Sequence, residues 1–124
     1  MDVTPIIPAD RQVIDSYGSR SFRVSGVAHR GAILVFPDRT EPWAAESAAG
    51  ITLESLAPVT AHGGIEILLI GCGPRAAMIA GDLRRGLRQA GIVVDAMDTG
   101  AACRTYNVLL AEDRRVAAAL LPAG

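Results

Sequence analysis

The stretch that most constrains the fold is residues 65–98, because its pattern is that of one β-α-β unit. Residues 65–70 form an apolar run rich in Ile and Leu that alternates little, as expected of a strand covered on both faces. A turn with two glycines follows at 71–74, a helix is predicted over 75–90, and a second strand over 92–97. A helical crossover of this kind joins parallel strands, so the stretch predicts an α/β fold.

The predicted helix has the usual start and stop signals. Pro74 fits the first helical position, where its missing N–H costs nothing, and Gly91 fits a left-handed cap past the last turn. Spacings of three and four residues predict one apolar stripe, formed by Ala76, Ile79, Ala80, Leu83 and Leu87.

Length and composition bound what such a chain can be. With 124 residues, half of them hydrophobic, it is expected to form one globular domain over residues 1–124. A net charge of -1 gives no general attraction to nucleic acid or anionic lipid. The first residues lack the basic and apolar regions of a signal peptide, and no run approaches the ~20 apolar residues of a membrane helix. A cytoplasmic protein that is not integral to a membrane is expected.

Local patterns predict the remaining elements. A short edge strand is expected within 12–17, and strands at 22–25 and 31–36 are expected to form a hairpin across a turn at 26–30. Trp43 is expected at the edge of the core, and a short helix is expected to start at Thr52 and to end or kink at Pro58. The last elements are a helix over about 100–112, capped by Asp98 or Thr99, and a strand over 116–121.

Three segments carry a family resemblance. Residues 69–74, residues 97–102 and above all the sequence Cys-Arg-Thr-Tyr-Asn-Val-Leu-Leu at 103–110 resemble the Mth938-like family, a domain of unknown function (DUF498). The resemblance implies an α/β three-layer fold whose mixed central sheet has a β-α-β core, with an N-terminal β-hairpin region to one side. It also implies a final strand antiparallel to its neighbours and no established enzyme activity. Position 72 is often Thr in that family, so Cys72 argues against a required thiol nucleophile.

The glycine turn is the first candidate site. Gly71-x-Gly73 after a strand, with Asp95 near the end of the next strand, matches the residue pattern of a dinucleotide-binding fingerprint. The N-terminus of the helix predicted after the turn would favour an anion. Against this, Pro74 removes one N–H donor, and the chain is short for two mononucleotide-binding halves. The alternative is a tight turn whose glycines serve only steric needs.

The segment Arg104–Asn107 is the second candidate, since its helix is expected to start beside the glycine turn. There Arg104 would clamp a carboxylate or phosphate, and Tyr106 and Asn107 would orient a polar ligand. The structural alternative pairs Arg104 with Asp98 or Asp95 and uses Tyr106 and Asn107 to fasten the chain. A surface for a partner protein is a third reading.

The cysteines and histidines support no catalytic or metal site. Cys72 and Cys103 form no C-x-x-C motif, and His29 and His62 lie in predicted turns far from both thiols, so buried, inert thiols are expected. No catalytic residue, cofactor or metal ligand is assigned.

Two hypotheses for the function remain. The first, which rests on the family and its mitochondrial complex I assembly factor, is a non-enzymatic accessory or interaction protein. It would help assemble a membrane complex such as respiratory complex I, reaching the inner face of the membrane through a protein partner. The alternative is a small-ligand or anion-binding protein, or a weak enzyme. Its site would be formed by Gly71, Cys72, Gly73, Thr99, Arg104, Tyr106 and Asn107.

Overall fold

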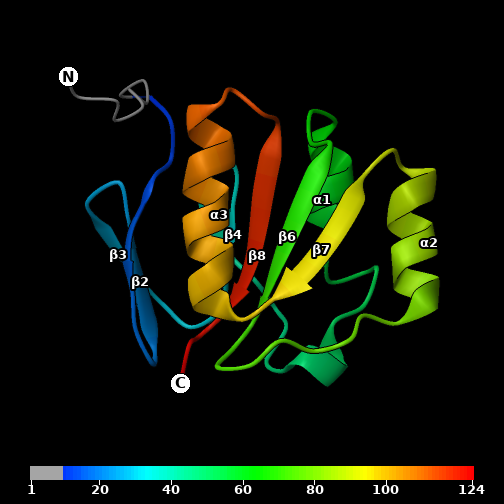
Figure 1. The fold of residues 1–124 in the computed structure, drawn as a ribbon, viewed down its shortest axis with the longest axis horizontal. Coiled ribbons are helices and arrows are strands. Elements are labelled where there is room, and N and C mark those ends of the chain that lie inside the picture. Colours follow the sequence, from blue (N-terminus) through cyan, green and yellow to red (C-terminus); the bar gives the residue numbers. More distant parts are fainter. Residues whose placement is uncertain (1–9) are drawn as a thin grey trace.

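A computed structural model describes residues 10–124, in which strands dominate the first half of the chain and alternate with helices in the second (Figure 1). The N-terminal residues 1–9, on which the signal-peptide argument rests, lie outside this range. In chain order the elements are β1 (Ile14–Tyr17), β2 (Ser21–Val24), β3 (Val27–Arg30), β4 (Ile33–Val35), β5 (Thr40–Pro42), a 3-10 turn (Ala48–Gly50), α1 (Ala57–His62), β6 (Ile67–Cys72), α2 (Gly81–Gln89), β7 (Val93–Met97), α3 (Thr99–Ala111) and β8 (Val116–Leu121).

The central layer is a mixed sheet of five strands in the order β5-β4-β8-β6-β7. β6 is parallel to both β7 and β8, whereas β4 is antiparallel to β5 and to β8. The helix α2 crosses from β6 to β7, and α3 crosses from β7 to β8, so the carboxyl ends of three adjacent strands reach the same edge (Figure 1). That edge is where open α/β sheets usually bind ligands.

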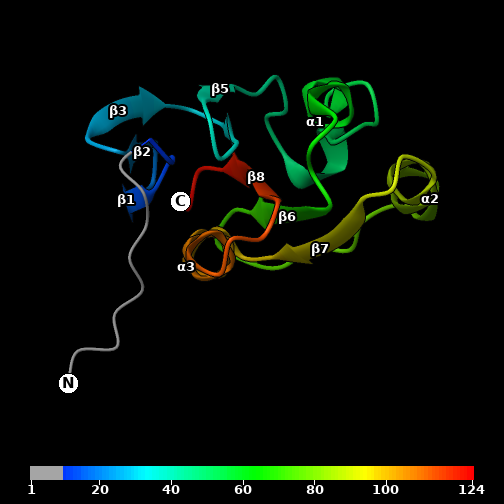
Figure 2. The same ribbon diagram turned by 90° about the horizontal axis from the view of Figure 1, so that it is seen from above.

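The two faces of this sheet are covered differently, which gives three layers (Figure 2). Alternate side chains of each strand point to opposite faces. On β8, Ala117 and Ala119 join the core under α1 and α2, whereas Ala118 joins the core under α3 and the small sheet β1-β2-β3. The predicted α/β fold with a mixed central sheet and a β-hairpin region to one side is confirmed.

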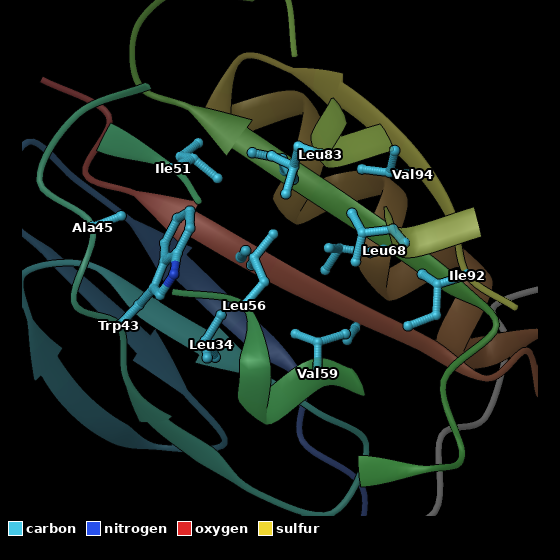
Figure 3. Packing of buried hydrophobic residues seen from close by; sticks show 14 of the residues in the cluster. Leu34, Trp43, Ala45, Ile51, Leu56, Val59, Leu68, Leu83, Ile92 and Val94 are labelled. Carbon is cyan, nitrogen blue, oxygen red and sulfur yellow. The ribbon is translucent and has the colours of Figure 1, made fainter. Parts of the chain in front are cut away.

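Trp43 fills the first of these cores beside Leu34, Ile51 and Leu56 (Figure 3). Its ring is buried, and Nε1 donates a hydrogen bond to the carbonyl oxygen of Ser55 at 3.0 Å. A buried indole N–H usually needs such a partner, so the expected burial of Trp43 is confirmed together with the bond that permits it.

The predicted helix over 75–90 is wrong in its first turns. α2 begins only at Gly81, so neither Pro74 nor the apolar residues of 76–80 lie on it. Ala77 and Ile79 instead pack against the core from irregular backbone, and this tertiary packing overrides their helical spacing. The end of the helix is confirmed, since Gly91 has a positive φ of 81°.

The N-terminal hairpin is shorter than predicted. Ser25 and Gly26 both have positive φ, at 45° and 83°, as a tight two-residue turn requires. The predicted turn at 26–30 is therefore wrong, because residues 27–30 form β3, which pairs with β2. The strand expected at 31–36 is β4, and it belongs to the central sheet.

Two other expectations need correction. The final strand β8 is antiparallel only to β4 and parallel to β6, because α3 itself is a long enough crossover for a parallel connection. Thr52 does not cap a helix but closes a turn, its Oγ1 accepting from the Ser55 N–H at 3.0 Å. Pro58 stands in the first turn of α1, where proline is tolerated, and does not end it.

Candidate functional site

Thr99 fastens three strand ends together at the carboxyl edge of the central sheet. Its side chain is completely buried. The Oγ1 hydroxyl donates to the Leu121 carbonyl at 2.6 Å and accepts from the Gly73 N–H at 2.9 Å. The backbone N–H of Thr99 also donates to the Gly73 carbonyl at 2.8 Å. The segments that leave β6, β7 and β8 are thus joined through one residue, and the N–H of Gly73 is already used.

The two glycines of the turn have separate structural reasons. A Cβ on Gly71 would lie 2.9 Å from Leu120 Cδ2 and 3.0 Å from the Thr99 Cα, so only glycine fits the existing packing. Gly73 has a φ of 91°, which L-amino acids with side chains rarely adopt. Because α2 begins at Gly81, the turn does not lead directly into a helix N-terminus as the dinucleotide fingerprint requires. These contacts favour the steric explanation of the glycines.

The polar atoms of Tyr106 and Asn107 bind the N-terminal part of the chain. The Tyr106 hydroxyl donates to the Gln12 carbonyl at 2.9 Å. Asn107 makes two bonds to one residue: Nδ2 donates to the Ile14 carbonyl at 2.8 Å, and Oδ1 accepts from the Ile14 N–H at 3.0 Å. Since β1 is an edge strand, the amide of Asn107 takes the place of a neighbouring strand. Both side chains hold β1 and the residues before it against α3.

Arg104 is the exposed member of the predicted group. Its Nη1 donates to the Tyr17 hydroxyl at 2.9 Å. The expected ion pair with Asp98 or Asp95 does not occur among residues 10–124, and Asp98 instead caps α3 by accepting from the Ala101 N–H at 2.8 Å. A hollow of about 360 Å³ lies beside Arg104 and is lined by Ile14, Asp15, Ser16, Tyr17, Cys103, Arg104 and Asn107.

Both thiols are free and buried, and they lie in different places. Cys103 lies on the buried face of α3, in the core that this helix shares with the small sheet, and burial raises the pKa of its thiol to about 12. Cys72 ends β6 and lines a second hollow. Cys103 is thus protonated at neutral pH and a poor nucleophile.

His62 belongs to a separate surface group. It stacks on Phe36 with ring centroids 5.0 Å apart, and its Nε2 lies 2.9 Å from Asp38 Oδ1. That hydrogen bond lowers the pKa of the Asp38 carboxyl. Within residues 10–124 no three His, Cys, Asp or Glu side chains gather as a metal site would need.

The second hollow, of about 520 Å³, is the larger of the two and contains Cys72 and Gly73 from the predicted set. The predicted residues are therefore divided between two hollows, with Arg104 and Asn107 in the other. The sequence reasoning missed Arg20 and Arg30, which also line the larger hollow. Neither stands in a recognisable motif, and the sequence predicted a turn at Arg30. Only the pairing of β2 with β3 brings these two residues to the same hollow.

None of the helices in the described part of the chain has the length and apolar character to cross a lipid bilayer.

Comparison with known proteins gives one family. A family described as "Protein of unknown function (DUF498/DUF598)" matches residues 14–121. An uncharacterized protein of Rhodobacter capsulatus is 39% identical over 110 residues, which cover 88% of this chain and 83% of that protein. The NADH dehydrogenase (ubiquinone) 1 alpha subcomplex assembly factor 3 of Xenopus tropicalis is 36% identical over 115 residues, covering 92% of this chain and 63% of the relative.

Solved structures show the same fold. The solution structure of a Mth938-like domain from Bordetella pertussis superposes with a TM-score of 0.84 at 30% sequence identity, covering 100% of this chain and 94% of that one.

Proposed function

The chain belongs to the DUF498/DUF598 family, and on that basis we propose that it is an accessory protein that acts through a protein partner. In this proposal it has no catalytic activity of its own and helps a membrane complex such as respiratory complex I to assemble. It works in the cytoplasm and reaches the inner face of the membrane through that partner.

The observation that carries the proposal is the similarity to complex I assembly factors. The relative from Xenopus tropicalis is named as an assembly factor of NADH dehydrogenase, and the similarity covers 92% of this chain. This chain spans 63% of that relative's length.

The internal hydrogen bonds of the candidate site also support a role without catalysis. Thr99, Tyr106 and Asn107 use their polar atoms to hold strands and helices together. Residues in such bonds are less free to bind a substrate, because each ligand bond would first have to replace an internal one.

Residues 74–80 include the most exposed large apolar side chain in the described part of the chain, Met78, which suits contact with a partner protein. The segment has irregular backbone, and the side chain of Met78 is 97% exposed. Methionine adapts its shape to a partner surface and is common at interfaces. We place the partner contact here, beside the start of α2.

The experiment is deletion of the gene for this chain in its own cells, followed by native gel electrophoresis of the membranes. We expect fully assembled complex I, and NADH oxidation by the membranes, to fall, while succinate oxidation stays unchanged. Complementation with the Met78→Asp variant should fail. Val27→Asp is the matched control, since it places the same charge at an exposed apolar position on β3. Normal complex I in the deletion strain would refute the proposal.

The alternative proposal is a small-ligand or anion site at the segment 104–107, apart from the Gly71–Gly73 turn, whose residues Cys72 and Gly73 line the other hollow. The hollow beside Arg104 is the observation in its favour. It predicts that the Arg104→Ala variant loses a small molecule that the wild-type protein retains on purification. Mass spectrometry of both proteins tests this, and a wild-type protein without any bound molecule would count against it.

A further inference from the structure

The larger hollow lies where the small sheet meets the carboxyl edge of the central sheet. It is lined by residues that end or follow β6 and β8, including Cys72 and Pro122. Arg20, from the β1–β2 turn, and Arg30, at the end of β3, also line it. In Figure 1 the lower ends of β6 and β8, the C-terminus and the small sheet meet in this region. The hollow has the size of a typical small-molecule site.

The backbone holds its two arginines next to each other. Arg30 pairs with Ser21 across the β2–β3 ladder, and the N–H of Gly31 donates to the carbonyl of Arg20 at 2.9 Å. The two arginines therefore stand on adjacent rungs at the open end of this ladder, where both line the hollow.

Within residues 10–124, neither arginine side chain forms an ion pair or a hydrogen bond. Among residues 10–124, eight of the twelve arginines form an ion pair or a side-chain hydrogen bond. The remaining four are Arg20, Arg30, Arg75 and Arg88, and two of these four line this one hollow. Two arginines in one lining, neither of them paired within residues 10–124, supply the donors that bind a phosphate or carboxylate.

The walls of the hollow are fixed before any ligand arrives. The Ala123 N–H donates to the Gly18 carbonyl at 3.1 Å, which ties the end of the chain to the β1–β2 turn. On the other side, the hydroxyl of Thr99 holds Gly73 and Leu121. A ligand would therefore enter a site whose backbone is already ordered, which lowers the entropy cost of binding.

We propose that this hollow binds a small organic anion, with its phosphate or carboxylate group held between the guanidinium groups of Arg20 and Arg30. Glu46 is the one acidic side chain in the lining. It repels a second negative charge, so the preferred ligand carries a hydroxyl or amino group that donates to Glu46. The hollow shares only Pro74 with the proposed partner surface at 74–80, and this proposal is independent of the assembly role.

The test is a titration of the full chain, followed by two-dimensional NMR of the backbone amides at constant ionic strength. The probes are inorganic phosphate, glycerol 3-phosphate and serine, so that phosphate and carboxylate ligands are distinguished. We expect saturable shifts around Arg20, Arg30 and Gly73, with dissociation constants on the order of 1 mM for inorganic phosphate. Tighter binding of glycerol 3-phosphate would identify a phosphate ligand, and tighter binding of serine a carboxylate ligand.

Three charge-neutralising variants make the test specific. Arg20→Gln and Arg30→Gln should each weaken binding about tenfold or more, since each removes a charge-assisted hydrogen bond. Arg88→Gln is the matched control: it removes the same charge from an exposed position on α2 and should change binding less than about twofold. Amide spectra verify that each variant is folded, and the mapped shifts of the wild-type protein test the location without any variant.

Glu46→Gln provides a second check. It should tighten binding of inorganic phosphate and remove the advantage of glycerol 3-phosphate over it. Shifts that do not saturate, that lie elsewhere, or that weaken equally in Arg88→Gln would overturn the proposal.

Discussion

Replacing Asn107 decides whether this side chain holds the fold or is available to a ligand. Its amide makes two hydrogen bonds to Ile14, at 2.8 and 3.0 Å, and the Ile14 side chain is buried. The Asn107→Leu variant keeps a similar volume and removes both bonds. Each bond contributes about 1 kcal/mol net, and a buried backbone group left without a partner costs about 1–3 kcal/mol. Water can reach an edge strand and offset part of that cost, so we expect a loss of about 3 kcal/mol.

Such a loss is measurable without unfolding the protein, because domains of this size have about 5–15 kcal/mol of stability. Urea denaturation followed by Trp43 fluorescence and far-ultraviolet circular dichroism gives the free energy of unfolding. The melting temperature should fall by roughly 10 °C. Hydrogen exchange of the Ile14 amide should accelerate as well, which shows that β1 has been released from α3.

Two further variants sharpen this prediction. Asn107→Asp keeps the acceptor for the Ile14 N–H but replaces the donor to the Ile14 carbonyl, so its loss should shrink at acidic pH as the new carboxyl gains a proton. Val108→Ala is the control, because its side chain lies next along the helix and is 55% exposed, and it should change stability by less than about 0.5 kcal/mol. If Asn107→Leu loses less than about 1 kcal/mol with normal exchange at Ile14, the structural role is refuted.

Three other predictions concern the same edge and core. Gly71→Ala puts its Cβ 3.0 Å from the Thr99 Cα and should lower the free energy of unfolding, measured with denaturant, by about 1–3 kcal/mol. Gly50→Ala is the control, because its Cβ would make an ordinary contact at 3.6 Å, and it should be nearly neutral. Thr99→Val removes the hydroxyl that links three strand ends and should cost about 2–4 kcal/mol, with Thr99→Ser closer to the wild type; equal losses in the two variants would contradict this role. The pKa of Cys103 is raised by burial from 9.0 to about 12. The folded chain therefore keeps a proton that the unfolded chain releases. Stability should be complete below about pH 9 and fall as pH rises toward 12, with Tyr106, whose pKa burial also raises, acting in the same direction. Unfolding curves at several pH values give the slope of the free energy of unfolding against pH. Cys103→Ala should make this slope shallower by up to about 1.4 kcal/mol per pH unit, and an unchanged slope would contradict the role of Cys103.

Local signals predicted the elements that local interactions stabilise. The strand at 116–121 was predicted with its observed bounds, and the helix predicted over about 100–112 runs from Thr99 to Ala111 with Asp98 as its cap. Both have short-range signals: an apolar run after a charged turn, and a capping side chain before a periodic stretch. The Ser25-Gly26 turn also had a signal, a Ser-Gly pair between two valines, and the predicted five-residue turn overlooked it.

The predictions that failed depend on distant parts of the chain. Residues 75–80 have helical spacing but irregular backbone, and from it Ala77 and Ile79 pack against a core formed by distant parts of the chain. The direction of β8 depends on the crossover that α3 makes from β7 to the other side of β6, and no pattern within residues 116–121 contains that information.

The sequence by itself determined that this chain forms an α/β fold around a β-α-β unit, and it singled out the segment 103–110. The tertiary structure alone decided what those side chains do. Tyr106 and Asn107 bond to Gln12 and Ile14, residues more than ninety positions away. Arg20 and Arg30 come together through the ladder of a hairpin that the sequence had not revealed. Secondary structure follows from neighbours along the chain, whereas a polar side chain is bound or free according to neighbours in space, which only the packed fold brings together.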